Sequence, residues 1–292
     1  MGDFSTERVT VSFPFEKTGV DCARPFAVKR TIGRCYRTSK GYIALFICLS
    51  SKAVHLEVVG DLPTQSFLAA LRRLAGRRGA PRKIWSDNAT TFHGADAELR
   101  SILREAESDW NLVQDSSANR GIKCKFIPPS ASHFGGLCES NIKSTKSLMK
   151  KVIGTQNLTY QELSTLAVEI EECMTFRPLL SIAGDPEDLD VLTPGHALVG
   201  RTLEQIPRAT TSDKELNKVT HWRLVQAMRD QFWKRWSHEY LHTLLQRNKW
   251  TLPKRNLQIG DVVLIVDPFL IRRGTWPLAR VTDVSAGQDG LV

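Results

Sequence analysis

Three carboxylates in this chain have the spacing and context of a metal-dependent site for reactions at phosphorus. Asp21 and Asp87 come at the ends of expected strands, and Glu139 comes at the start of an expected helix. Carboxylate oxygens suit Mg²⁺ and Mn²⁺. Two such ions about 4 Å apart can stabilise the attacking and leaving oxygens of an in-line displacement. Each acid alone could equally be a turn or capping group, but their joint placement favours a two-metal site.

Three lysines follow Glu139 at spacings of three and four residues, which places all four side chains on one face of a helix predicted from Leu137 to about Ile153. They are Lys143, Lys146 and Lys150. A row of ammonium groups suits a phosphate backbone, so these lysines are candidate DNA ligands. The alternative is a solvated basic face on an ordinary amphipathic helix, since charge runs on helices are common.

The composition indicates a basic globular protein. The 292 residues carry 40 Lys+Arg against 31 Asp+Glu, and this surplus of +9 favours nucleic acid as the partner. No apolar run approaches membrane-spanning length, and the N-terminus has no signal region, so we expect neither a membrane partner nor secretion. The six cysteines form no CxxC pair, which indicates a reducing compartment without structural zinc. His238 and His242 have metal-ligand spacing but are expected to be a helix-surface pair.

The elements that must position the acids follow a mixed α/β order with five strands. Apolar stretches predict strand-like segments first, and residues 40–51 and 52–59 should pair as a hairpin. A capping box of Thr159 and Glu162 starts the last helix of this part. Strand-like segments at 9–15, 25–30, 40–51 and 52–59 are expected to supply three adjacent antiparallel strands, and segments 83–87 and 121–127 are expected to supply two more. The expected helices are 65–78, 95–107, 137–153 and 160–175. Sites in open α/β sheets gather at strand ends, where Asp21 and Asp87 are expected.

The second part of the chain is predicted to differ in organisation. Residues 192–199 look like a loop, residues 214–247 are helical with an aromatic stripe suited to packing, and strands are expected at 257–267 and 275–284. The chain stops as a further strand begins, so we expect an incomplete SH3-like β-barrel. The expected organisation is a core at 9–185, a linker at 186–212, and a helix plus small basic barrel, C-terminally incomplete, at 213–292.

Several segments, in this order, together resemble the integrase of BEL/Pao-type LTR retrotransposons. They are Val20-Asp21, Pro25-Phe26, Trp85-Ser-Asp-Asn-Ala-Thr-Thr-Phe-His-Gly-Ala95 and Pro128-Pro-Ser-Ala-Ser-His-Phe-Gly-Gly-Leu-Cys-Glu139. The resemblance covers most of the chain. It implies an RNase H-like fold, a five-stranded mixed sheet with flanking helices, and a catalytic, metal-binding triad of Asp21, Asp87 and Glu139. Departures at Cys22, Arg24 and Cys138 leave these three carboxylates in place.

The resemblance also implies an activity. It implies 3′-end processing and strand transfer of element DNA into host DNA, with two Mg²⁺ or Mn²⁺ ions and a homo-multimeric enzyme. Lys143, Lys146 and Lys150 would hold DNA phosphates, and Asn88 and His133 would orient backbone or ligand groups unless they are simple turn residues. The expected location is the nucleus at integration and a cytoplasmic particle before it.

Two alternatives remain open from the sequence. One is a catalytically inactive or domesticated DNA-binding relic of an integrase. The zinc-binding module that integrases carry upstream is not in this sequence, so a polyprotein fragment is expected. The other is an RNase H-type nuclease, which would share the fold and the ions.

Overall fold

The centre of the fold is a mixed β-sheet between two layers of helices. The computed structural model describes residues 10–23, 25–29, 37–60, 64–86, 90–110, 122–126, 145–181, 191–201, 221–244, 257–265 and 276–285. Within these residues the sheet has seven strands in the order β6-β5-β1-β3-β2-β7, and β4 also pairs with β3. Their bounds are β1 Lys17–Cys22, β2 Phe26–Lys29, β3 Thr38–Cys48, β4 Val54–Val59, β5 Lys83–Ser86, β6 Lys123–Phe126 and β7 Leu158–Thr159.

The directions and order of the strands define the fold class of the sheet. β3 is antiparallel to both β1 and β4, whereas β5 is parallel to β1 and β6 is parallel to β5. The order β4-β3-β1-β5-β6, with three antiparallel strands followed by two parallel ones, is the RNase H-like arrangement, so the predicted fold class is confirmed. Two short strands extend the sheet beyond one end of β1: β2 matches the strand-like segment predicted at 25–30, whereas β7 was not predicted.

The first strand lies later in the chain than predicted. Residues 10–16 are not a strand, and Val11 and Phe13 are 97% and 81% exposed. The chain turns at Phe15, which has a positive φ of 60°, and β1 begins at Lys17. Pro14 lacks an N–H group for a sheet ladder, which explains why the apolar stretch before it does not pair.

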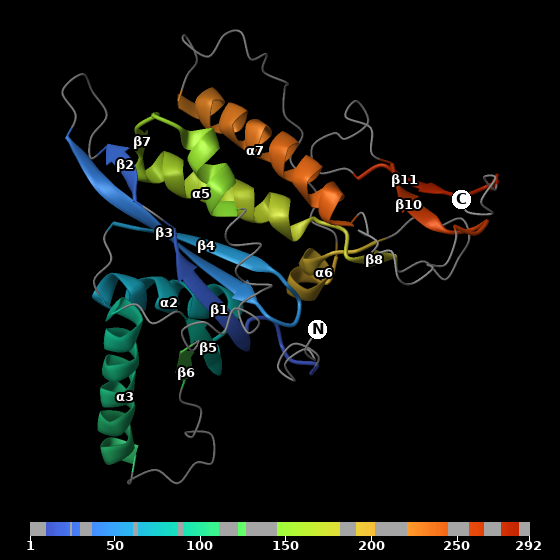
Figure 1. Ribbon diagram of the computed structural model, residues 1–292. Helices are drawn as coiled ribbons and strands as arrows, with labels where there is room; N and C mark the ends of the chain where they lie inside the picture. The colour runs from blue at the N-terminus through green and yellow to red at the C-terminus, as the bar shows by residue number, and fades with distance from the viewer. Residues whose placement is uncertain are drawn as a thin grey trace.

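Alternating residues of the central strands supply two separate cores. Ile43, Leu45 and Ile47 of β3 pack on one face with α5 (Tyr160–Thr175), the helical segment 145–153 and α7 (His221–Leu244). The residues between them pack on the other face with α2 (Thr64–Arg78) and α3 (Thr90–Trp110). Figure 1 shows α5 and α7 on one side of the sheet and α2 and α3 on the other. The period of two in β3 therefore builds a three-layer molecule.

Local signals account for several helix ends. The capping box at Thr159 is confirmed, because its side chain accepts from the Glu162 N–H while the Glu162 carboxylate accepts from the Thr159 N–H. Residues 192–199, predicted as a loop, instead contain α6 (Pro194–Val199), which ends at Gly200 with φ of 74°. Proline at the first turn and glycine after the last are ordinary helix boundaries. β8 (Leu180–Ser181) and β9 (Val191–Leu192) pair just before α6.

The last part of the described chain packs through aromatic side chains. Trp233 and Trp236 of α7 are buried, as expected for the aromatic stripe, and both contact Trp276. The Trp276 indole N–H donates to the Phe176 carbonyl at the end of α5. β10 (Val262–Leu264) and β11 (Leu278–Arg280) form an antiparallel pair, and a complete barrel stays a prediction, as does the division into domains. Among the described helices, none is long and apolar enough to cross a membrane.

Candidate active site at the end of β1

The parallel pairing of β1 and β5 brings Asp21 and the end of β5 to one edge of the sheet. Gly19 pairs with Trp85, so both strands run toward the same edge. Asp21 lies near the end of β1, and Ser86, which is buried, ends β5. Asp87 follows Ser86 directly in sequence but lies outside the described residues. The strand-end position predicted for Asp21 is therefore where the structure has it.

Asp21 forms an ion pair with one of the predicted DNA-binding lysines. Its Oδ2 lies 2.6 Å from Nζ of Lys146, and its Oδ1 accepts from the Cys22 backbone N–H. Both side chains are partly exposed, at 34% for Asp21 and 24% for Lys146. The predicted acid and the predicted helix therefore meet, and a cationic group already occupies one oxygen of the carboxylate.

A β-bulge follows Asp21. Cys22 pairs with Ala44 of β3 and Phe26 pairs with Gly41, so three residues of one strand face two of the other. A one-residue slip changes which side chains share a face of the sheet. Val20 accordingly packs in the core under α2, while Ala23, Phe26 and Val28 belong to the core that contains the helical segment 145–153. The bulge thus puts Phe26 on the same face as Asp21.

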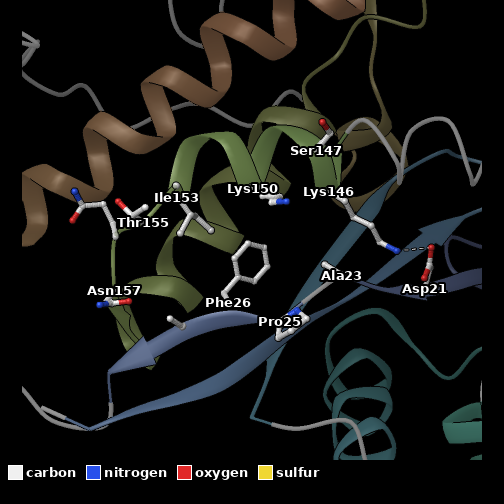
Figure 2. A pocket seen from close by; sticks show the side chains of 13 residues that line it. Asp21, Ala23, Pro25, Phe26, Lys146, Ser147, Lys150, Ile153, Thr155 and Asn157 are labelled. Carbon is white, nitrogen blue, oxygen red and sulfur yellow. Dashed lines mark ion pairs between the residues drawn. The ribbon is translucent and has the colours of Figure 1, made fainter.

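A cavity of about 870 Å³ opens between this bulged strand and the helical segment 145–153. Figure 2 shows Asp21 and Lys146 joined at one end, with the ring of Phe26 projecting toward the helix near Ile153. The remaining lining residues are Ala23, Pro25, Ala27, Ser147, Lys150, Gly154, Thr155, Gln156 and Asn157. Of the predicted site residues, the structure brings Asp21, Lys146 and Lys150 to this one cavity.

The other predicted site residues lie outside the described part of the chain. They are Asp87, Asn88, His133, Glu139 and Lys143. Within the described ranges, no group of three or more His, Cys, Asp or Glu side chains could hold a metal ion. His238 and His242 contact each other through Nε2 atoms 3.1 Å apart on the exposed side of α7. The three-acid site therefore stays a prediction, with Asp21 as its described member.

A second group of charged side chains, buried around β4, connects helices of both layers to the sheet through ion pairs. His55 is 2% exposed and lies between two carboxylates, with Nε2 3.2 Å from Glu57 and Nδ1 3.1 Å from Glu171. Arg78 of α2 reaches Glu171 of α5 at 2.6 Å, and the Leu56 backbone N–H donates to the same carboxylate. We call His55, Glu57, Glu171 and their arginine partners the β4 charge network.

Further arginines of α2 complete the β4 charge network. Arg73 and Arg77 each contact Glu57 at 2.6 Å, and Arg73 also donates to the Val58 carbonyl. The Tyr160 hydroxyl of α5 donates to the same carbonyl. Side chains from α2 and α5 thereby satisfy backbone groups of β4 and tie both layers to this strand.

The charges in this network shift one another's pKa. Burial lowers the pKa of His55, but hydrogen bonds and charge from Glu171 and Glu57 outweigh it, so the pKa is raised above the ordinary value of 6.5. Burial raises the pKa of Glu171 and Glu57, yet His55 and the arginines outweigh it, so both are lowered below 4.5. These shifts all favour the charged form of the three side chains.

Sequence reasoning missed the bulged strand segment that lines the cavity, and it also missed the β4 charge network. Pro25 inside a strand pattern was an available signal for the bulge, because proline interrupts a sheet ladder. His55 and Glu57 alternate with apolar residues in β4, which predicts that they share a face. Their partners lie about 20 and over 100 residues away in sequence, as the pairs with Arg77 and Glu171 demonstrate. Nothing local in the sequence pointed to those partners.

Comparison with known proteins gives a partial match. Residues 220–292 match DUF5641, described as a family of unknown function. No curated protein matches the chain significantly.

Two solved structures that match this chain do so at low identity and with low TM-scores. One is a chain of the simian T-cell lymphotropic virus intasome in complex with PP2A regulatory subunit B56 gamma. It has 15% identity, a TM-score of 0.42, and coverage of 68% of this chain and 60% of that chain. Another is the HTLV-2 integrase catalytic core domain in complex with magnesium, in a dimeric form. It has 15% identity, a TM-score of 0.37, and coverage of 57% of this chain and 91% of that chain. The fold assignment above rests on the strand order rather than on these superpositions.

Proposed function

We propose that this chain is a retrotransposon integrase of the BEL/Pao type, a metal-dependent polynucleotidyl transferase. It would process the 3′ ends of element DNA and join them to host DNA in the nucleus, acting as a homo-multimer. The observation that carries the proposal is the position of Asp21: a partly exposed carboxylate at the end of β1 in an RNase H-like sheet, beside the end of β5 and paired with a cationic group.

Among the described residues, the Asp21 carboxylate suits a divalent cation. Asp21 already holds a positive charge at 2.6 Å through the Lys146 ammonium, so its carboxylate lies where a cation is stabilised. We propose that Asp87 and Glu139 supply the other carboxylates, on the evidence of the sequence pattern alone. When bound, Mg²⁺ or Mn²⁺ would stabilise charge on the attacking and leaving oxygens of the displacement.

The chain's own residues would hold and orient the DNA. A metal ion bound to Asp21 would displace the Lys146 ammonium from the carboxylate. The ammonium would stay nearby and would form a new ion pair with a phosphate of the bound strand. Lys150 lies one helical turn further on and would contact the next part of the same backbone. In the first step water would attack a phosphodiester of the element DNA and release a 3′-hydroxyl. In the second step that hydroxyl would attack a phosphodiester of the target DNA, and the 3′-oxygen of the target would be the leaving group.

Metal-dependent removal of 3′-terminal nucleotides from a labelled duplex tests the catalytic part of this proposal. Asp21→Asn, Asp87→Asn and Glu139→Gln should each abolish product in Mg²⁺ and in Mn²⁺ while the circular dichroism spectrum stays that of the wild type. Asp283→Asn, which changes an exposed acid near the C-terminus, is the matched control and should keep full activity.

The same assay separates the proposal from its alternative. Full activity in Asp21→Asn would show that this carboxylate takes no part in the reaction and would refute the assignment. A wild-type protein that binds the duplex in EDTA and yields no product in either metal would instead be a catalytically inactive DNA-binding relic.

A further inference from the structure

We propose that His238 and His242, on the exposed face of α7, form a two-ligand site for a first-row transition-metal ion such as Zn²⁺ or Ni²⁺. The two imidazoles would supply two ligands and leave the other coordination positions of the ion open. The site lies within residues 220–292, the segment that matches the family of unknown function. It is separate from the carboxylates proposed to bind Mg²⁺ or Mn²⁺, and it does not depend on the proposed function.

The spacing of the two histidines brings their ring nitrogens to the separation of two ligands on one ion. Positions four residues apart face the same side of a helix. The Nε2 atoms are 3.1 Å apart, and the ring centroids are 4.5 Å apart. With metal–nitrogen bonds of about 2.0–2.1 Å, a separation of 3.1 Å corresponds to an angle of about 95–102° at the ion. This angle lies between about 90° for square-planar or octahedral sites and about 109° for tetrahedral ones, the geometries that these ions adopt.

The two nitrogens are available to an ion. Within the described part of the chain, the hydrogen-bond partner of each Nε2 atom is the other Nε2 atom. A neutral imidazole has one donor and one acceptor nitrogen, so one Nε2–H group donates to the other ring. An ion can take the place of this hydrogen, and the ring that loses it carries it on Nδ1 instead. Both side chains are exposed, so either ring can rotate toward an ion without disturbing the core.

The end of α7 favours a bound cation. The helix ends at Leu244, and His242 belongs to its last turn. The carbonyl groups of a last turn lack helical partners and form the negative end of the helix dipole, so a dication held there is stabilised. Lys234 and Arg235 precede His238 by about one turn and oppose this effect, which lowers the affinity for an ion without changing the ligand geometry.

The ligand type determines the class of ion. Imidazole nitrogen suits Zn²⁺, Ni²⁺ and Cu²⁺, whereas Mg²⁺ prefers oxygen ligands and keeps several of its waters. Among the described residues, no third His, Cys, Asp or Glu side chain joins the pair in a metal-binding group. Water or a second copy of this chain would therefore fill the open positions. The expectation of a simple surface pair rested on the number of ligands, and the Nε2 separation is the observation that changes it.

An ion at this site would connect two turns of the helix that anchors the C-terminal strands. Tyr240 lies between the two histidines in sequence. Its ring stacks on Trp236 and contacts Trp276, and its hydroxyl donates to the Pro178 carbonyl. A link between the residues on either side of Tyr240 would hold this turn of α7 helical. The role that follows for the ion is structural: it would keep Tyr240 against these partners.

Isothermal titration calorimetry of the untagged whole chain with Ni²⁺ and with Zn²⁺ tests the inference without any catalytic readout. The wild type should bind each ion saturably, and excess Mg²⁺ should not compete. His238→Gln and His242→Gln should each weaken binding by roughly 100-fold, because one of two linked ligands is lost. His93→Gln is the matched control and should leave the affinity unchanged, since His93 is exposed on α3 and has Ala97 four residues further on.

Two double variants separate the spacing of the histidines from their number. Lys234→His combined with His242→Gln restores a pair four residues apart, one turn earlier on the same helix, and should recover most of the lost affinity. Glu239→His combined with His242→Gln also keeps two histidines, but at adjacent positions whose side chains do not face each other. This variant should bind as weakly as His242→Gln.

Unfolding in urea with and without Ni²⁺ provides a second readout. An ion that binds the folded helix stabilises it, so Ni²⁺ should raise the urea midpoint of the wild type and not that of His238→Gln. Loss of binding in both single variants with recovery by the spaced pair supports the site. One ion per chain would then assign water to the open positions, and one ion per two chains would assign a second copy. Wild-type affinity in His238→Gln, equal binding by the two double variants, or no saturable binding by the wild type overturns the inference.

Discussion

Replacing Glu171 by Gln should destabilise the protein by about 3–5 kcal/mol at pH 5.5, the usual cost of removing one partner from a buried ion pair. The Glu171 carboxylate accepts from Arg78 and His55 and from the Leu56 backbone N–H. Its side chain is 9% exposed, so water cannot replace the lost partners. A glutamine offers one acceptor oxygen and turns an N–H₂ group toward at least one of these donors, which leaves buried charge uncompensated.

The cost should depend on pH in a defined direction. The pKa of His55 is raised above 6.5, so its stabilising charge is fully present below about pH 6.5 and is lost as pH rises through the raised value. The pKa of Glu171 and of Glu57 is lowered below 4.5, so their contribution is present above about pH 4.5 and is lost as pH falls through the lowered values. The network is therefore most stabilising between about pH 4.5 and 6.5, and the cost of Glu171→Gln should be smaller at pH 9 than at pH 5.5.

Urea unfolding followed by circular dichroism at both pH values measures this. Glu162→Gln is the matched control, because it is the same substitution on the same helix and glutamine can still accept from the Thr159 N–H of the capping box. The control should cost less than about 1 kcal/mol, the value of an ordinary cap. Equal costs for the two variants at pH 5.5, or a larger cost of Glu171→Gln at pH 9, would refute the reasoning.

Three further predictions address packing and the acid at the end of β1. Leu166→Ala removes a fully buried side chain of α5 and should cost about 2–5 kcal/mol in urea unfolding; a cost below 1 kcal/mol would contradict the packing of this helix. Gly41→Ala would bring a Cβ to 2.5 Å from Val28 Cγ2 and should cost about 1–3 kcal/mol in the same assay, and a neutral effect would contradict that close approach. Lys146→Gln removes the cation that competes for Asp21, so Mn²⁺ should bind roughly two- to fivefold more tightly by calorimetry; unchanged affinity would mean that the ammonium does not compete.

The sequence predicted features that depend on local signals and missed those that depend on pairing. Residues 40–51 are a strong apolar stretch and residues 52–59 alternate, and together they form the predicted β3–β4 hairpin. The Thr159 capping box starts α5 where expected. The register of β1 depends instead on its neighbours β3 and β5, so the stretch at 9–15 was wrongly taken as a strand and β1 begins at Lys17. The bulge after Asp21 depends on the same pairing and was missed with it.

The candidate site was predictable in its residue types but not in its contacts. Asp21 and Lys146 were both identified, one as a metal ligand and one as a phosphate ligand, yet nothing in either segment indicated that they form an ion pair. Phe26 was placed in the strand-like segment 25–30 and in the sequence resemblance, but it was not assigned to the site, because the bulge determines which face of the sheet it occupies. The spacing of residues along one element sets which face they share; the distance between elements comes from packing.

Joining of a labelled 3′-hydroxyl DNA end to a plasmid, with wild type beside Asp21→Asn, tests the central claim most directly. The account predicts joined product with the wild type in Mg²⁺ or Mn²⁺, none in EDTA, and none with the folded variant in any condition. Joining by Asp21→Asn at the wild-type rate, or joining by the wild type in EDTA, would contradict it. Tight DNA binding by the wild type with no joining in either metal would contradict it as well and would leave a DNA-binding module.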